Sequence, residues 1–267
     1  MSKTALTLLL AALFIASCGT KTQQTAKETQ GVYFDSIQVD STSLLSTNKD
    51  GPQCKLSIHL QYAKGGKADK INTTLLRSGI LEPDYFSPDE EPASIKMAVD
   101  SFVKRYIKEY QRDYAPLYRD DQVHKASYNC TYSVRTKTEN GGGDIINYIA
   151  SIYVFGGGAH GITQTLVKNF DAKTGQLITL NDIFVPGYEQ SMKELLIEKM
   201  AKKFNVKDLE ELKSKYIFAD NHVYVPENFI LKDDKLTFIY CEDEIAPHAA
   251  GEIRIEFNRS EIKRLCK

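Results

Sequence analysis

The sequence contains no tryptophan, only five cysteines and almost no net charge. Its 34 Lys and Arg residues are balanced by 35 Asp and Glu residues, for a formal net charge of -1. A protein that neutralises many phosphates needs a basic excess, so we expect no nucleic-acid partner. The rest of the composition, 42 % hydrophobic and 26 % charged over 267 residues, is typical of a globular protein. It excludes collagen-like, coiled-coil and wholly disordered chains.

Motifs of the common enzyme classes are also absent from the sequence. It has no GxSxG elbow, no HExxH and no CxxC. Residues 156–161 (GGGAHG) are rich in glycine, but they do not match GxxxxGK[ST]. Their glycines have the GxGxxG spacing, but a predicted strand follows them and not a helix, so we expect no nucleotide. The sequence therefore predicts no cofactor, and a protein without enzymatic activity is the favoured interpretation.

Residues 1–17 are typical of a signal peptide, with a positive charge at Lys3 and an apolar segment too short to span a bilayer. This segment ends in Ala-Ser-Cys-Gly at residues 16–19, which resembles the lipobox of bacterial lipoproteins, where cleavage occurs just before the cysteine. The resemblance implies that Cys18 carries lipid and that the protein is exported and held in the cell envelope, facing the periplasm. Residues 18–30 are polar and predict a flexible tether.

Four of the five cysteines remain once Cys18 is lipidated. In an oxidising compartment they allow two disulfides with three connectivities. Cys54 and Cys130 both open strand-like segments, which makes them candidates for a cross-strand pair, whereas Cys241 ends a strand and Cys266 lies next to the C-terminus. The alternative is that these cysteines are small buried hydrophobic residues. The sequence leaves both interpretations open.

Alternation of polar and apolar residues predicts strands, which include residues 55–62, 128–135, 235–241 and 252–257. Residues 145–155 are apolar on both faces, as expected of a central strand. Apolar residues spaced by three and four predict helices, the clearest at 95–110 and 189–204 and shorter ones at 69–76 and 207–215. Hairpins interleaved with a few helices predict an α+β fold of antiparallel sheets packed with helices. We expect two sequential subdomains, residues 31–155 and 156–267.

Four segments, in a fixed order, resemble one known family: 153–161 (YVFGGGAHG), 169–184 (NFDAKTGQLITLNDIF), 228–240 (NFILKDDKLTFIY) and 244–251 (EIAPHAAG). They look like the extracytoplasmic domain of unknown function in RsiV-type anti-sigma factors, which in PdaC-type peptidoglycan deacetylases is paired with a smaller preceding domain. The resemblance implies a PdaC-like N-terminal and an RsiV-like C-terminal subdomain. It also implies binding, because RsiV-type domains recognise lysozyme. His248 departs from the family pattern, in which a bulky aromatic residue is expected.

The candidate ligand surface consists of Tyr153, His160, Glu244 and His248. His160 contacts a ligand or hydrogen-bonds its own turn, and the structural role is favoured. The acidic residues 242–244 together with both histidines would compose a hard-cation or zinc site if the two loops met. Nothing in the sequence requires them to meet, so a solvated loop is favoured and no metal is predicted.

The sequence leads to one main functional hypothesis and two alternatives. The main hypothesis is a non-enzymatic envelope lipoprotein that binds an extracytoplasmic partner, either a lysozyme-like protein or a peptidoglycan or glycan fragment. The first alternative is a cell-wall glycan hydrolase or deacetylase with an unrecognised site near His160, Glu244 and His248. The second is a purely structural envelope component, which is favoured if the fold has no concave polar pocket.

Overall fold

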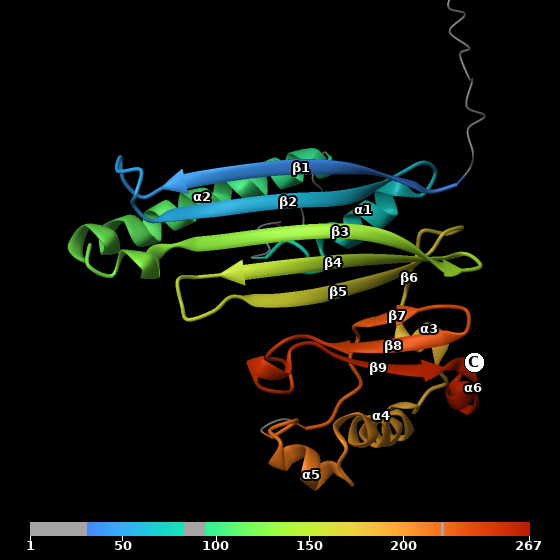
Figure 1. Ribbon diagram of the computed structural model, residues 1–267. Coiled ribbons are helices and arrows are strands. Elements are labelled where there is room, and N and C mark those ends of the chain that lie inside the picture. Colours follow the sequence, from blue (N-terminus) through green and yellow to red (C-terminus); the bar gives the residue numbers. More distant parts are fainter. Residues whose placement is uncertain (1–30, 83–93, 220–221) are drawn as a thin grey trace, which may run out of the picture.

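The computed structural model describes residues 31–82, 94–219 and 222–267, which form a six-stranded and a three-stranded sheet packed with helices (Figure 1). The α+β class predicted from the sequence is confirmed. The predicted signal peptide, Cys18 and the tether lie outside the described residues. Within the described residues, no helix combines the length and the hydropathy needed to cross a membrane.

The six-stranded sheet has its strands in chain order from one edge to the other: β1 (Tyr33–Leu44), β2 (Gln53–Lys64), β3 (Cys130–Gly142), β4 (Ile145–Phe155), β5 (Ile162–Asp171) and β6 (Leu177–Ile178). All neighbours are antiparallel except β2 and β3, which run parallel. Parallel neighbours need a long crossover connection. Here the crossover contains α1 (Ala68–Leu76), α2 (Ile95–Asp120) and the short 3-10 helix η1 (Lys125–Tyr128).

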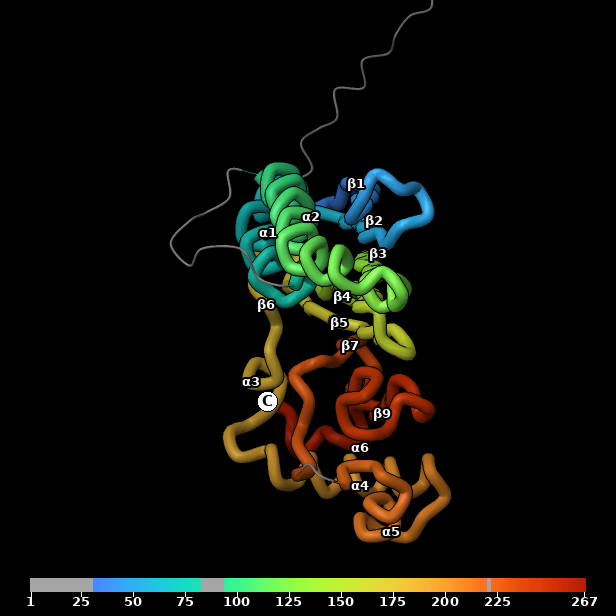
Figure 2. The backbone as a smooth tube through the Cα atoms, turned by 90° about the vertical axis from the view of Figure 1, so that its left-hand side faces the viewer, coloured from blue at the N-terminus to red at the C-terminus, as the bar shows by residue number. Residues whose placement is uncertain are grey.

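Helices α1 and α2 cover one face of this sheet, as the side view shows (Figure 2). Helix α2 begins after Ser94, whose hydroxyl accepts the Met97 amide, and it buries the predicted apolar stripe. The sequence predicted its end at Tyr110, but the helix continues to Asp120 through Pro116. The extension is stabilised by packing, because Tyr114 and Tyr118 continue the stripe and contact the ring of Tyr128.

The three-stranded antiparallel sheet consists of β7 (Phe229–Leu231), β8 (Lys235–Tyr240) and β9 (Ile253–Asn258). Its helices are α3 (Leu180–Ile183), α4 (Glu189–Phe204), α5 (Leu209–Ser214) and α6 (Arg259–Ile262), with 3-10 turns η2 (His248–Ala250) and η3 (Lys263–Leu265). The fully buried side chains of Met192, Leu196 and Met200 place the predicted stripe of α4 in a second core, separate from the one under α2.

The six-stranded sheet continues across the boundary that the sequence predicted between residues 155 and 156. Strand β5 pairs with β4 from Ile145↔Asp171 to Val154↔Ile162, and β6 adds a further pair. The two strands form a hairpin around the glycine-rich segment, so separating them would expose the edge of β4. The change from one sheet to the other therefore comes after β6, near residue 179.

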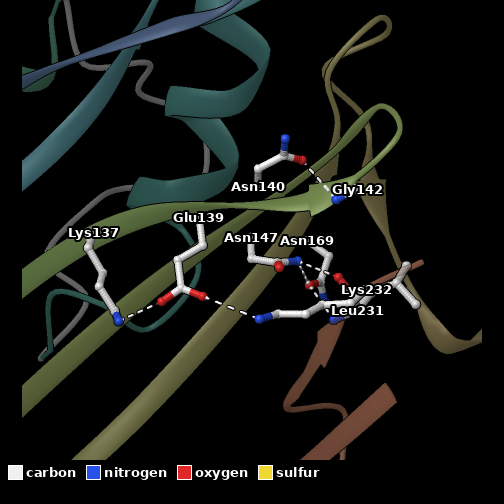
Figure 3. A network of polar contacts seen from close by, with 8 residues as sticks. All are labelled: Lys137, Glu139, Asn140, Gly142, Asn147, Asn169, Leu231 and Lys232. Atoms are coloured by element: carbon white, nitrogen blue, oxygen red, sulfur yellow. Dashed lines mark hydrogen bonds and ion pairs between the residues drawn. The ribbon is translucent and has the colours of Figure 1, made fainter. Parts of the chain in front are cut away.

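Two buried asparagines connect the sheets (Figure 3). Asn147 on β4 donates from Nδ2 to Asn169 Oδ1 at 2.8 Å and to the Leu231 carbonyl at 2.9 Å. Asn169 on β5 donates to the Phe229 carbonyl at 2.9 Å and accepts the Leu231 amide at 3.2 Å. Because these bonds reach the backbone of β7, they fix the three-stranded sheet against β4 and β5. A small apolar cluster, Ile149, Val167, Ile230 and Ile239, packs at the same junction.

Candidate functional site

The loop between β4 and β5 meets the loop between β8 and β9. The ring of His160 stacks on the ring of His248, with centroids 3.8 Å apart and an interplanar angle of 19°. The two residues are far apart in the sequence and come from different sheets, which is why the sequence left their proximity undecided. We refer to His160 and His248 as the histidine pair.

Two carboxylates lie beside His248. Its Nδ1 is 3.2 Å from Glu242 Oε1 and 3.2 Å from Asp243 Oδ2. The other oxygen of Glu242 accepts the backbone amide of Thr163 on β5 at 2.6 Å, and the Glu242 side chain is only 16 % exposed. Glu242 therefore connects the two loops and fixes the position of His248.

Asp243 has a left-handed backbone, with φ of 63°. Few residues other than glycine adopt this conformation, although Asp and Asn tolerate it better than most. The conformation turns the chain sharply between Glu242 and Glu244, so that Glu242 and Asp243 both reach the histidine pair.

Glu244, which the sequence placed in the ligand surface, makes different contacts. It accepts the Cys241 amide at 2.6 Å and the hydroxyl of Tyr224. Burial, followed by the hydrogen bond to this carboxylate, raises the pKa of Tyr224 above its usual range. These contacts give Glu244 a structural role within the loop.

Tyr153 flanks the loop from β4, with 37 % of its surface exposed. Its ring lies against Gly161, where an added Cβ would come within 2.4 Å of the Tyr153 hydroxyl oxygen. A larger residue at position 161 would therefore force the Tyr153 ring to move, which the sequence alone did not indicate. Thr163 on β5 pairs with Tyr153 on β4, and the Thr163 amide donates to the Glu242 carboxylate.

A polar groove of about 530 Å³ lies between the two sheets. Its lining comes from β3, β4, β5, β7, β8 and β9: Lys137, Glu139, Ile149, Ser151, Thr165, Ile230, Lys232, Lys235, Thr237, Arg254 and Glu256. Ser151 and Thr165 are opposite each other, and the next pair on the same face is Tyr153 and Thr163. The groove therefore leads along β4 and β5 toward the histidine pair.

Ion pairs occupy the rim of this groove. Glu139 binds Lys137 at 2.6 Å and lies 3.9 Å from Lys232, as Figure 3 shows. Lys235 binds Glu256 at 2.9 Å. The lining holds more cationic than anionic side chains, which favours a ligand that carries negative charge or many hydrogen-bond acceptors. Sequence reasoning missed the groove because its residues come from six separate strands and one turn and form no local motif.

Two of the four remaining cysteines form a disulfide, and the other two are free thiols. Cys54 and Cys130 are paired in register at the start of β2 and β3 and form a disulfide, with Cα atoms 4.5 Å apart. Cys241 and Cys266 are free thiols. Burial raises the pKa of Cys241 to about 11, and its thiol donates to the Thr165 carbonyl. Cys241 is therefore suited to packing and poorly suited to nucleophilic chemistry.

Comparisons with known proteins find a family match in the C-terminal part of the chain. Residues 181–260 match the family model DUF3298, described as a protein of unknown function. A solved DUF3298 member from Bacteroides fragilis is 27 % identical, with a TM-score of 0.78 over 90 % of this chain and 96 % of that one. A DUF3298 family protein from Pseudomonas aeruginosa is 18 % identical, with a TM-score of 0.58 over 88 % and 95 %. No curated protein matches the chain.

Proposed function

We propose that this protein is an envelope lipoprotein of the RsiV/PdaC type whose folded part binds an extracytoplasmic partner and catalyses no reaction. The observation that supports the proposal most is the polar groove between the two sheets. Its volume falls in the range of ligand sites in general.

The lining suits a fragment of peptidoglycan or another glycan. Ser151, Thr165 and Thr237 offer hydroxyl groups for sugar hydroxyls, and the ion pairs of the rim surround them. Exposed ion pairs are worth only about 0–1 kcal/mol each, so they exchange partners readily. Lys232 or Arg254 can therefore bind the carboxylates of a peptide stem at small cost. A lysozyme-like protein is the other partner class, and it would engage the outer loops rather than the groove.

Binding is favoured over glycan hydrolysis by the placement of the polar groups. The lining of the groove includes neither histidine nor cysteine. Both oxygens of the Glu244 carboxylate accept hydrogen bonds, one from the Tyr224 hydroxyl and one from the Cys241 amide. These contacts occupy the carboxylate that the hydrolase hypothesis needs as an acid or base.

Isothermal titration of the purified protein with muropeptides, and separately with lysozyme, tests this proposal. We expect saturable binding of the muropeptide without its cleavage. Ser151→Trp fills the groove and should abolish binding, because Ser151 is exposed on its floor. Thr42→Trp, at an exposed position on β1, is the matched control and should bind normally.

Three outcomes would contradict the proposal. Absence of binding to both probes would overturn the proposal. Equal effects of the two Trp variants on muropeptide affinity would show that the groove is not the binding site. Release of acetate or of shortened glycan by the protein would favour the hydrolase or deacetylase instead. Binding of lysozyme that is insensitive to Ser151→Trp would support the binding function with a protein partner.

A further inference from the structure

We propose that His160, Asp243 and His248 bind a divalent transition-metal ion, with Zn²⁺ the best suited. One ligand atom from each residue lies within 4.8 Å of the other two. The three residues come from two loops on different sheets, so their meeting is a property of the fold and not of local sequence.

The donor set determines the class of ion. Two imidazole nitrogens and one carboxylate oxygen match the ligands that zinc takes in proteins, and three protein ligands leave a fourth position open. Calcium and magnesium prefer sets made of oxygen alone. Soft ions prefer thiolates, and Cys241, the thiol in this loop, is buried and bonded to the Thr165 carbonyl.

The side chains can close around an ion without disturbing the core. In a tetrahedral site with bonds of about 2.0–2.1 Å, ligand atoms lie about 3.3 Å apart. The stacked rings must therefore turn so that their nitrogens converge. His160 and Asp243 are exposed and His248 is partly exposed, so none of the three side chains is buried in the core.

Glu242 orients one ligand in advance. Metal-binding histidines commonly donate their second ring N–H to a carboxylate, which sets the tautomer. Glu242 Oε1 is 3.2 Å from His248 Nδ1, and the Thr163 amide fixes this carboxylate from the other side. With Nδ1 as the donor to Glu242, Nε2 of His248 carries the lone pair for the ion.

The left-handed backbone at Asp243 is a second, independent element of preorganisation. It places this carboxylate beside Nδ1 of His248, so only a rotation of the Asp243 side chain is needed to bring an oxygen toward the ion on the Nε2 side. By contrast, His124 and Asp121 form an exposed pair at 2.8 Å within one turn of chain, with no second histidine. The His124–Asp121 pair therefore represents an ordinary surface contact, which we do not expect to bind the ion.

Titration of Zn²⁺ alone into chelator-treated protein, followed by calorimetry, tests the site. We expect one saturable equivalent and a higher melting temperature. His160→Ala, His248→Ala and Asp243→Asn should each weaken binding at least about tenfold, and Glu242→Gln by a similar factor. Asn tolerates the left-handed backbone, so Asp243→Asn keeps the loop conformation. His124→Ala is the matched control and should leave the affinity unchanged.

Absence of saturable Zn²⁺ binding in the wild-type protein would overturn the proposal. So would binding that survives all three ligand variants, as expected if a free thiol held the ion. The melting temperature of each metal-free variant shows whether it is folded. No muropeptide or protein partner enters the experiment, so its result is independent of the proposed binding function.

Discussion

The Asp35 carboxylate shows how a single exposed residue links stability to pH. Hydrogen bonds from Lys64 first, then from the Ser36 amide and the Tyr62 hydroxyl, lower its pKa from 3.8 to about 2. Its folded pKa lies below the unfolded value, so its contribution is complete above about pH 4 and is lost as the pH falls toward 2.

Asp35→Asn should therefore destabilise the protein at pH 6 and lose that effect on acidification. Denaturant unfolding of both proteins between pH 6 and pH 2 measures the difference, which should shrink as the wild-type carboxylate is protonated. A difference that stays constant with pH would show that the charge of Asp35 does not contribute. An NMR titration of the Asp35 side chain gives its pKa directly.

At the scale of elements, the disulfide between β2 and β3 closes a loop with a sequence separation of 76. A cross-link of this length restricts the unfolded chain, and its removal typically costs about 2–5 kcal/mol. We expect Cys54→Ala/Cys130→Ala to lower the free energy of unfolding by that amount. Denaturant unfolding of the oxidised wild-type protein, the reduced wild-type protein and the double variant measures it.

Cys266→Ser is the control for this prediction, because Cys266 is a free thiol that is only partly buried. It should leave the stability nearly unchanged. If the oxidised and reduced wild-type proteins unfolded at the same denaturant concentration, the disulfide would have no stabilising role.

The asparagine bridge makes a second prediction about elements. Asn169→Ala removes an acceptor for the Leu231 amide and a donor for the Phe229 carbonyl, both at buried residues. Each buried polar group left without a partner costs about 1–3 kcal/mol, so we expect a loss of about 2–4 kcal/mol. Denaturant unfolding gives this loss, and faster amide exchange at Leu231 would localise it to β7.

Asn140→Ala is the comparison, because Asn140 accepts the Gly142 amide in an exposed turn. It should cost less than about 1 kcal/mol. Equal losses for the two variants would mean that burial of the bridge does not matter.

Local pattern predicted the single elements of this fold well. The alternation at residues 55–62 lies within β2, and the stripe from Ile95 is the buried face of α2. It did not predict the parallel pairing of β2 with β3, since that register depends on a crossover of more than sixty residues. Nor did it predict that β5 stays with β4, because an apolar strand does not reveal which neighbour covers it.

At the candidate site, too, the residues could be predicted from local sequence, but their contacts could not. Residue type identified His160 and His248, whereas their contact depends on how two sheets pack, and no local signal carries that information. Glu244 was chosen for its charge and its neighbours, but Tyr224 and the Cys241 amide engage it. The left-handed backbone at Asp243, which brings Glu242 and Asp243 to His248, is visible only once the structure is known.

At the scale of the whole molecule, we propose that lipid on Cys18 anchors the folded part through the tether of residues 18–30. The near-neutral charge supports this proposal, because it offers no polybasic segment for attachment to anionic lipid. We expect Cys18→Ser to release the protein from the membrane fraction. Mass spectrometry of the wild-type protein should show an N-terminal acylated cysteine, and an unmodified Cys18 would contradict this.

The most direct test of the central claim is hydrogen exchange of the purified protein with and without a muropeptide. Binding in the groove predicts slower exchange in β4 and β5 and in β8 and β9, with β1 at the far edge of the sheet unchanged. Ser151→Trp should remove this protection. Unchanged exchange throughout, or protection confined to α2 and β1, would contradict the assignment of the groove as the binding site.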